Sequence, residues 1–367
     1  MTRMNRPDPA RPADPPSEEE RELPTERGVV VGRPDSGGGA ATPSFEPPSG
    51  APSGVPGVPE PLRIGRCLFT WGERTYVMGV VNVTPDSFSG DGLLAVGGDI
   101  AAAAVALAVR MVTEGADILD IGGESSRPGH DAVTPAEERR RVVPVVAAIH
   151  AAHPATPLSI DTTKPGVAAA ALDAGASLIN DVWGVAEDSA LVALAAERGV
   201  PIVLMHNRAE ARYSSVVAEV IADLQRAIDR ALRAGVEWDS IVVDPGFGFG
   251  KTPAHNLALL RDLAALRILG RPVLLGTSRK STLGKVLDLP ADERLEATLA
   301  TTALGIAAEI DIVRVHAVRE NVRAARMADA IVRGVLATGA ATGPEDSTAT
   351  GPADTAAPGA DRRISSR

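Results

Sequence analysis

The chain has 367 residues, of which 44% are hydrophobic and 23% are charged, the composition of an ordinary globular protein. Its net charge of −10 argues against a general nucleic-acid-binding protein, and its single cysteine, Cys67, excludes an intrachain disulfide and a cysteine-based zinc site. It contains no run of about 18 apolar residues and no apolar core of a secretory signal, so we expect a cytoplasmic protein without a membrane span.

Both ends of the chain are predicted to be disordered tails. Residues 1–60 contain 13 of the 29 prolines together with clusters of Gly, Ser and Glu, and residues 336–367 have a similar composition. Segments of this kind cannot bury enough apolar surface to offset the entropy that ordering costs. We therefore expect one folded domain at residues 62–335.

The folded region begins with a predicted β-hairpin, RCLFTWGERTYV, at residues 66–77. Short apolar runs follow, separated by stretches of helical spacing that are rich in Ala, Leu and Arg, such as residues 215–235. Continuous apolar runs that alternate with helices are typical of buried parallel strands. The predicted strands cover residues 76–81, 117–122, 157–160, 177–180, 201–205, 240–244, 272–276 and 311–315.

Eight strand–helix units within about 250 residues match the size and number expected of a TIM barrel. The alternative is an open doubly wound sheet, which usually has fewer units and carries a phosphate fingerprint after its first strand. We therefore predict an α/β fold, a TIM (β/α)8 barrel. The N-terminal hairpin is expected to cover the bottom of the barrel, where the apolar interior would otherwise meet water.

Polar residues follow every predicted strand, at the end where a TIM barrel holds its active site. One polar residue near solvent would mean little, but polar residues after all eight strands indicate a ligand pocket. In chain order they are Asn82; Glu124, Ser125, Ser126 and Arg127; Asp161; Asn180 and Asp181; His206 and Asn207; Asp244; Ser278, Arg279, Lys280 and Ser281; Arg314 and His316.

Lysine is rare in this chain, with 4 residues against 33 arginines. A chain that fills most cationic positions with Arg can reserve Lys for sites that need a compact point charge. Lys280 is the best functional candidate. Lys164 and Lys251 also lie near strand ends, but we interpret them as solvated charges that begin or flank helices.

Residues 242–252, VVDPGFGFGKT, look like a phosphate-binding loop but match no such motif. Pro245 stands where a Walker A loop has its first glycine, and Lys251 stands at the third glycine of the dinucleotide fingerprint. We interpret PGFGFG as a tight turn that presents Asp244 at the mouth of the barrel. Two phenylalanines of this turn either line the pocket or pack beneath the loop: Phe247 and Phe249.

Together these motifs resemble those of dihydropteroate synthases, transferases of folate biosynthesis. The resemblance implies a TIM barrel that joins 6-hydroxymethyl-7,8-dihydropterin pyrophosphate to p-aminobenzoate and releases pyrophosphate. The matching stretches occur in family order across nearly the whole folded region: MGVVNVTPDSFSGDG (78–92), DIGGESSRPG (120–129), SIDTTKPGV (159–167), LINDVWG (178–184), PIVLMH (201–206), DPGFGFGKTPAHN (244–256), GTSRKS (276–281) and RVHAV (314–318).

The resemblance assigns the pterin ring to Asp161, Asn180, Asp244 and Lys280. The 2-amino-pyrimidinone edge of a pterin offers adjacent N–H donors, which suit carboxylate and amide acceptors, and a lysine can donate to the other edge. Asp161 could instead cap the following helix, although two threonines beside it could do so equally well.

The anion is expected at Arg314 and His316, immediately before a helix that starts near Val318. Arg127 is expected to close over the pyrophosphate. The family uses Mg²⁺ with this group, and Asn82 matches the protein contact of that ion, because Mg²⁺ keeps most of its ligands as water and phosphate oxygens. Asp161, Lys280, Arg314 and His316 are therefore the expected catalytic residues.

Two long loops, about 82–97 and 123–133, are expected to order over bound pyrophosphate and to form the aminobenzoate slot. His206 is interpreted as a hydrogen-bonded wall residue. The remaining expected substrate contacts are Phe88 and Pro128 with the aminobenzoate ring, Ser281 with its carboxylate, and Ser125 and Ser126 with the substrates or pyrophosphate.

Three segments depart from the family pattern. The first loop reads SFSGDG where SFSDGG is common, which bears on its closure. The segment after LMH reads NRAEARY where the family has a Met-Gly-containing segment, and Ala317 stands where Asp is common. None of these removes a residue to which the resemblance assigns the pterin or the pyrophosphate.

Two alternatives stay open at the level of sequence. A methyltetrahydrofolate corrinoid-protein methyltransferase shares the pterin carboxylates and amide but has no need for the Ser-Arg-Lys-Ser and Arg-Val-His segments. A non-catalytic paralogue that binds pterins or scaffolds other proteins would be favoured by loss of Asn82, Arg127 or His316, all of which are present. A homodimer is expected from the family resemblance alone.

Overall fold

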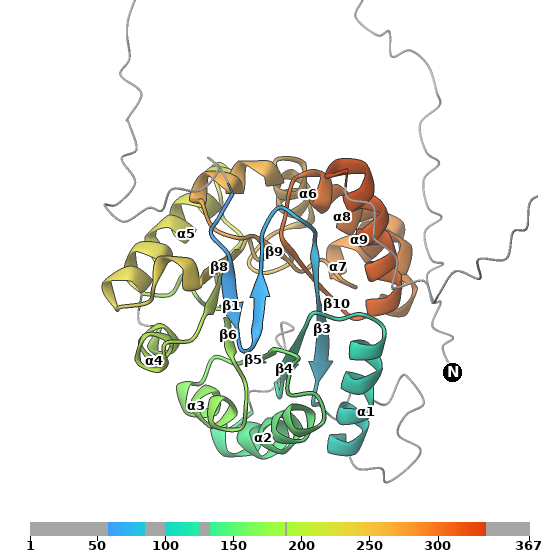
Figure 1. The fold of residues 1–367 in the computed structure, drawn as a ribbon. Helices are drawn as coiled ribbons and strands as arrows, with labels where there is room; N and C mark the ends of the chain where they lie inside the picture. Colours follow the sequence, from blue (N-terminus) through green and yellow to red (C-terminus); the bar gives the residue numbers. More distant parts are fainter. Residues whose placement is uncertain (1–57, 85–99, 125–132, 188, 335–367) are drawn as a thin grey trace, which may run out of the picture. The chain divides into compact units, whose positions relative to one another are not determined.

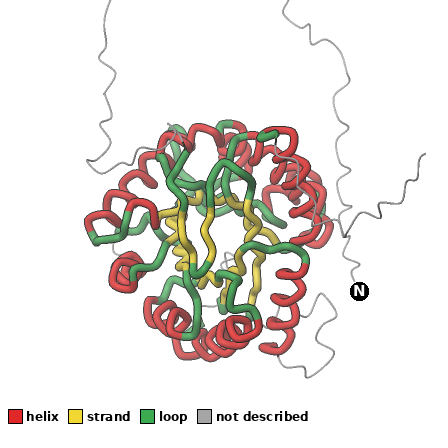
Figure 2. Tube along the Cα trace, viewed as in Figure 1, coloured by secondary structure: helices red, strands yellow, loops and turns green. Residues whose placement is uncertain are grey.

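The computed structural model describes residues 58–84, 100–124, 133–187 and 189–334. The predicted tails fall outside these ranges except for residues 58–60, so their disorder stays a prediction. The described residues form eight parallel strands surrounded by helices, which confirms the predicted TIM barrel (Figure 1). Figure 2 shows the strands as an inner ring enclosed by the helices. No helix in the described part is long and apolar enough to cross a membrane.

Neighbouring strands of the barrel pair in parallel, in the order β8-β7-β6-β5-β4-β3-β10-β9. A bridge between Val243 and Val273 brings the two ends of this order together. Strands joined in this way by helices are buried on both faces, which explains their continuous apolar runs. The strands are β3 (Tyr76–Asn82), β4 (Ile118–Gly122), β5 (Leu158–Asp161), β6 (Leu178–Asp181), β7 (Ile202–Met205), β8 (Ile241–Asp244), β9 (Leu274–Leu275) and β10 (Ile312–Val315).

Local signals in the sequence set the ends of several helices. Thr134 caps α2 by accepting a hydrogen bond from the backbone N–H of Glu137, and Gly199 ends α4 with a left-handed φ of 60°. The helices are α1 (Ile100–Thr113), α2 (Pro135–Ala152), α3 (Pro165–Asp173), α4 (Ala190–Arg198), α5 (Val216–Arg233), α6 (Pro253–Arg261), α7 (Ser281–Leu287), α8 (Leu295–Ala307) and α9 (Val318–Val332).

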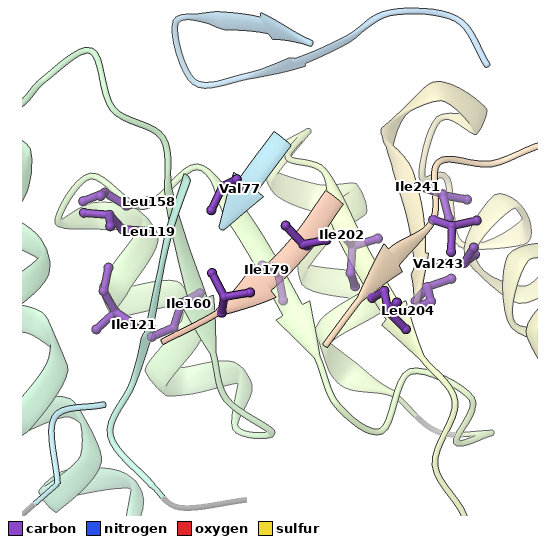
Figure 3. Close-up of a cluster of buried hydrophobic side chains, with 14 of the residues drawn as sticks. Val77, Leu119, Ile121, Leu158, Ile160, Ile179, Ile202, Leu204, Ile241 and Val243 are labelled. Carbon is purple, nitrogen blue, oxygen red and sulfur yellow. The ribbon is translucent and has the colours of Figure 1, made fainter. Parts of the chain in front are cut away.

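Alternate side chains along each strand build two separate hydrophobic layers. Leu119 and Ile121 of β4 belong to the layer between the strands and the helices (Figure 3). Ile118, one residue earlier, belongs instead to the layer inside the barrel. The barrel is therefore a packed core and not a channel, and a ligand can enter only from one of its ends.

An antiparallel hairpin of β1 (Leu62–Ile64) and β2 (Cys67–Phe69) covers the end where the strands begin. Ile64 and Phe69 pack in one cluster with Met78 of β3 and the rest of the interior layer. This confirms the predicted cover, although the hairpin occupies residues 62–69 and not 66–77. Gly65, whose φ of 58° is left-handed, makes the tight turn, and residues 76 and 77 already belong to β3.

The two faces of the hairpin give a matched test of this cover. Phe69 is 2% exposed and its neighbour Leu68 is 56% exposed. We expect Phe69→Ala to lower the free energy of unfolding by about 3–5 kcal/mol, because it opens a cavity under the barrel. Leu68→Ala should change it by less than about 0.5 kcal/mol. Urea denaturation followed by circular dichroism measures both, and equal losses would show that the hairpin does not seal the core.

Candidate active site

The interior of the barrel changes from apolar to polar within one two-residue step along several strands. Inward-facing positions recur every second residue, so each of these strands carries one apolar side chain below and one polar side chain above. The upper ends of the parallel strands thus build one polar layer directly on the apolar core. The steps run from Ile118 to Asp120, from Leu178 to Asn180, from Val242 to Asp244 and from Ile312 to Arg314.

Arg314 of β10 bonds side chains of two other strands in this polar layer, and a third strand is linked through Asp120. Its Nε donates to Oδ2 of Asp120 at 2.6 Å, and its Nη2 donates to Oδ2 of Asp161 at 2.7 Å. The amide of Asn180 donates to the same oxygen of Asp120 at 3.0 Å. Burial raises the pKa of Asp161 to about 7, and the guanidinium of Arg314 opposes that shift. The arrangement holds carboxylates of two neighbouring strands around one cation.

Asp120 was not predicted as a site residue, because it lies within an apolar run and not after it. It is fully buried, and its Oδ1 has no hydrogen-bond partner among the described residues. A charged residue inside an apolar strand, DILDIG, was the signal that could have identified it. A buried carboxylate normally requires compensation, and here Arg314 and Asn180 provide it on one oxygen only.

Asp244 ends β8 and is held by the turn that follows it. Its Oδ1 accepts a hydrogen bond from the backbone N–H of Gly246 at 2.7 Å, and burial raises its pKa. Gly246 has a φ of 68°, and a Cβ at this position would overlap the carbonyl oxygen of His206. The turn therefore requires this glycine, and it fixes Asp244 at the polar layer as predicted.

Lys251 lies at the centre of this turn and is not the solvated charge that the sequence suggested. Its ammonium donates to the carbonyl oxygens of Gly246 at 3.0 Å and Phe249 at 3.1 Å, and it lies 2.9 Å from Nδ1 of His206. Burial lowers the pKa of Lys251 to about 7, against which the negative charge of Asp244 favours the protonated form. A phosphate loop points N–H groups inward, whereas this turn points carbonyl oxygens at a cation, so it is not built for phosphate.

His206 is fully buried between a cation and an anion, as expected for a hydrogen-bonded wall residue. Its Nε2 lies 3.0 Å from Oδ2 of Asp223, and its Nδ1 faces Lys251. Because an ammonium only donates, Nδ1 accepts and Nε2 carries the proton, which gives the neutral imidazole. Burial and the charge of Lys251 together lower the pKa of His206 to about 4.

Lys164 also differs from its interpretation as a solvated charge. Its ammonium donates to Glu124 and to the fully buried Glu138, both at 2.5 Å. The other oxygen of Glu124 accepts from the backbone N–H of Val133 at 2.8 Å. The ion pairs and this hydrogen bond thus link the two described ends of the β4–α2 connection, residues 124 and 133, to the start of α3.

The two phenylalanines of the glycine-rich turn have different roles. Phe249 is half-buried, and its ring centroid lies 3.7 Å from the ammonium of Lys280, a cation–π distance. Phe247 is 1% exposed and packs in the layer between strands and helices. Of the two roles that the sequence left open, Phe247 therefore packs beneath the loop and is not an exposed ligand contact.

A cavity of about 630 Å³ opens beside these groups. Its size suits a small-molecule ligand. It combines carboxylate, aromatic and hydroxyl groups from loops that follow several different strands. Among its lining residues are Asp161, Thr162, Trp183, Arg208, Phe249 and Ser281.

His316 and the loop after β9 are linked at the neighbouring strand end. Nδ1 of His316 lies 3.0 Å from the hydroxyl of Ser278, and its backbone N–H donates to the same hydroxyl at 3.2 Å. Helix α9 begins at Val318, where the sequence predicted a helix N-terminus. Ala317 precedes it without a side-chain cap. The imidazole and the helix start therefore lie together, as an anion site requires.

The remaining predicted contacts divide into two groups. Asn82 ends β3, partly exposed, and pairs with Gly122 of β4; Ser281 begins α7 and lines the cavity. The other predictions lie outside the described residues and stay predictions: Phe88, Ser125, Ser126, Arg127 and Pro128.

The environment of His206 predicts an unusual titration. Its imidazole should stay neutral down to about pH 4, while an unfolded histidine takes up a proton near pH 6.5. Between these values the unfolded state binds more protons, so the free energy of unfolding falls as the pH falls, by up to about 3 kcal/mol. Nitrogen-15 NMR of the imidazoles as a function of pH, assigned with a His206→Asn variant, measures the pKa of His206. A His206 signal that titrates near pH 6.5 would contradict the lowered pKa.

Comparisons with known proteins identify the family to which the chain belongs. A model of the pterin-binding enzyme family matches residues 78–316. The chain is 48% identical over 273 residues to a dihydropteroate synthase of Clostridium beijerinckii, an alignment that covers 74% of this chain and 100% of that relative. The structure of Xanthomonas albilineans dihydropteroate synthase with 4-aminobenzoic acid superposes with a TM-score of 0.70 at 43% identity, covering 75% of this chain and 98% of that one.

A second structure of the Xanthomonas albilineans enzyme, in complex with 7,8-dihydropteroate, gives a TM-score of 0.67 at 41% identity, covering 74% of this chain and 98% of that one. Family model, sequence relatives and structures thus agree with one another over the folded region. The chain belongs to the dihydropteroate synthase family of pterin-binding enzymes.

Proposed function

We propose that this dihydropteroate synthase joins 6-hydroxymethyl-7,8-dihydropterin pyrophosphate to p-aminobenzoate within the polar layer of its barrel. The observation that carries this proposal is the convergence of Asp161, Asn180 and Asp244 from β5, β6 and β8, with Lys280 over the Phe249 ring beside them. Structures of related enzymes contain 4-aminobenzoic acid or 7,8-dihydropteroate, which supports the same pair of substrates here.

The pterin ring is expected to replace contacts that the protein makes with itself. In the described structure the guanidinium of Arg314 donates to Asp161, and the amide of Asn180 donates to Asp120. The N–H donors of the 2-amino-pyrimidinone edge can take over the carboxylate of Asp161. This releases one arm of the Arg314 guanidinium toward the diphosphate, while its Nε stays on Asp120.

The reaction breaks the C–O bond at the pterin methylene, and the bonding electron pair leaves with the pyrophosphate oxygen. Arylamines are weak nucleophiles, so departure of the leaving group precedes attack by the amine. Asp161 stabilises the positive charge that spreads over the pterin, and Arg314 and His316 stabilise the leaving diphosphate. The amine nitrogen then bonds to the methylene carbon and releases its proton to water. No covalent bond to the enzyme is needed.

The donor set fits a hydrated Mg²⁺ that is held mainly by the substrate. The described residues contain no group of three or more His, Cys, Asp or Glu side chains able to hold a metal ion. Asn82 offers a single amide oxygen at the end of β3, which suits an ion whose other ligands are water and phosphate oxygens. Such an ion would neutralise negative charge on the leaving group.

The chain offers an apolar surface for the proposed homodimer. Leu304 of α8 is 63% exposed, and Met327 and Ile331 of α9 are 62% and 71% exposed. Met327 and Ile331 are four residues apart and share one face of α9, and α8 packs against this helix. Exposed apolar side chains on two adjacent helices are typical of subunit contacts.

An assay of the purified chain with both substrates and Mg²⁺, recording pyrophosphate release, tests the function. We expect Asp161→Asn to lower kcat/KM by about 10²–10³-fold, because it removes the charge that faces the pterin. Asp173→Asn, which alters an exposed carboxylate on α3 that pairs with Arg198, is the control and should retain full activity. Chelation by EDTA should abolish turnover. A wild-type chain that releases no pyrophosphate, or an unaffected Asp161→Asn variant, would refute the proposal.

Light scattering coupled to size-exclusion chromatography tests the dimer. We expect the mass of two chains for the wild type and of one chain for Ile331→Asp, because the variant places a charge in a contact from which water is excluded. Arg198→Asp, on the distant α4, is the matched surface control. A monomeric wild-type chain, or an unchanged mass for Ile331→Asp, would contradict this surface.

A further inference from the structure

Helix α7, which follows Lys280 directly, is flanked by two unusual backbone conformations. Arg279 has a φ of 58° and Asp288 a φ of 56°, and only one other non-glycine residue in the described ranges has a positive φ. Left-handed backbone is unfavourable for residues with a side chain, so the surrounding structure must hold it. One of these positions immediately precedes the lysine that the pterin requires.

A single guanidinium connects the two ends of α7. Nη1 of Arg294 donates to the carbonyl oxygen of Arg279 at 3.0 Å. Its Nε and Nη2 donate to the carbonyl oxygen of Leu289 at 3.0 and 2.8 Å. The planar fork of an arginine presents its N–H donors in a fixed geometry, and here it reaches both carbonyls at once. Arg294 therefore binds the carbonyl of one left-handed residue, Arg279, and the carbonyl of the residue that follows the other, Asp288.

Gly284 is the position in α7 that admits this guanidinium. A Cβ built on Gly284 would overlap Cζ, Nε and Nη2 of Arg294. Glycine inside a helix is unfavourable compared with alanine, so its presence in so short a helix needs a reason. Glycine is needed here because the guanidinium packs directly against the backbone of α7 and leaves no room for a side chain.

The hydroxyl of Thr298 completes the support of Arg279. Its Oγ1 accepts from the backbone N–H of Arg279 at 3.2 Å and donates to the carbonyl oxygen of Arg294 at 2.8 Å. One turn further along α8, the hydroxyl of Thr301 lies 2.7 Å from that of Thr277, which precedes the same turn. Both polar backbone groups of Arg279 are thus bound to residues at the start of α8.

We propose that Arg294 and Thr298 are positioning residues for the synthase reaction. They hold Arg279 in the left-handed conformation that directs Lys280 over Phe249 and places Ser281 at the cavity. Neither residue touches the substrate. They act through the backbone on the two residues that follow Arg279. This inference rests on the proposed function, because it concerns how that site is held in shape.

A double-mutant cycle with Lys280 separates positioning from general stability. In the full chain we expect Arg294→Ala to weaken binding of the pterin pyrophosphate about tenfold, measured by calorimetry, and to lower kcat/KM about 10²-fold. In a Lys280→Ala background the same change should weaken binding less than about twofold, because the group that it positions is gone. Arg198→Ala, which removes an exposed guanidinium on α4, is the control and should retain wild-type binding and activity.

Gly284 supplies an independent arm of the experiment. Gly284→Ala alone should impair binding, because the new methyl group displaces the guanidinium. In the Arg294→Ala background it should add less than about a twofold effect. If Arg294→Ala does not fold by circular dichroism, Thr298→Val replaces it in the cycle, since it keeps the shape of the side chain and removes the acceptor for the Arg279 N–H together with the hydrogen bond to the Arg294 carbonyl.

The outcomes distinguish this inference from the function on which it rests. An inactive wild-type chain refutes the function. An active wild-type chain with wild-type pterin affinity in Arg294→Ala and Thr298→Val refutes the positioning role. Equal losses in the wild-type and Lys280→Ala backgrounds also refute it, because they show that the residues act on folding in general.

Discussion

The site depends on one electrostatic constraint: carboxylates placed on the apolar core of a barrel must be compensated within the barrel. Asp120 and Asp161 share the guanidinium of Arg314 across strands that are 153 or more residues apart in sequence. Leaving a buried charge unpaired would cost several kcal/mol, so the polar layer can form only when all of these strands are in place. Assembly of the barrel and assembly of the site are therefore the same event.

Compensation by the side chain of Arg314 also gives such a layer a way to bind a ligand. An arginine that neutralises the acids before the substrate arrives can exchange those contacts for the N–H groups of a flat heterocycle. The cation then lies near the group that must leave. Around this exchange the scaffold is fixed: Lys251 holds the glycine-rich turn by its carbonyl oxygens, and Arg294 holds the turn before α7. Rigid turns thus surround the one ion pair that has to rearrange.

The fold was predictable from sequence because it rests on periodicity. Continuous apolar runs gave the strands nearly residue by residue, with β9 the main exception. Residues 272–276 were predicted as a strand, but only Leu274–Leu275 adopts it, since the chain already turns toward Ser278 after Gly276. The hairpin was found but displaced, because Gly65 makes the turn and the sequence pattern around it is short.

Two site residues were predictable because a polar residue ends a strand, at Asp161 and Asp244. Spacing alone did not separate Asn180 from Asp181, and the family resemblance selected Asn180. Site residues were missed where their role depends on a partner that is distant in sequence. Asp120 lies inside a strand, and the residues next to it in sequence do not indicate that it pairs with Arg314, which is 194 residues away. Lys164 and Lys251 looked like solvated charges because the acceptors of Lys164 lie on a distant loop and on helix α2, and those of Lys251 are backbone carbonyls. Phe247 and Phe249 are indistinguishable by sequence, and only the conformation of the turn sends one inward to the core and the other to the cavity.

The central claim is that the pterin takes the place of Arg314 on Asp161. A crystal structure of the chain soaked with 6-hydroxymethyl-7,8-dihydropterin pyrophosphate tests it most directly. The account predicts the ring within hydrogen-bonding distance of Asp161, Asn180, Asp244 and Lys280, with the guanidinium turned to the diphosphate and its Nε still on Asp120. A ring bound elsewhere, or an Arg314–Asp161 pair left intact beneath the bound ring, would contradict it.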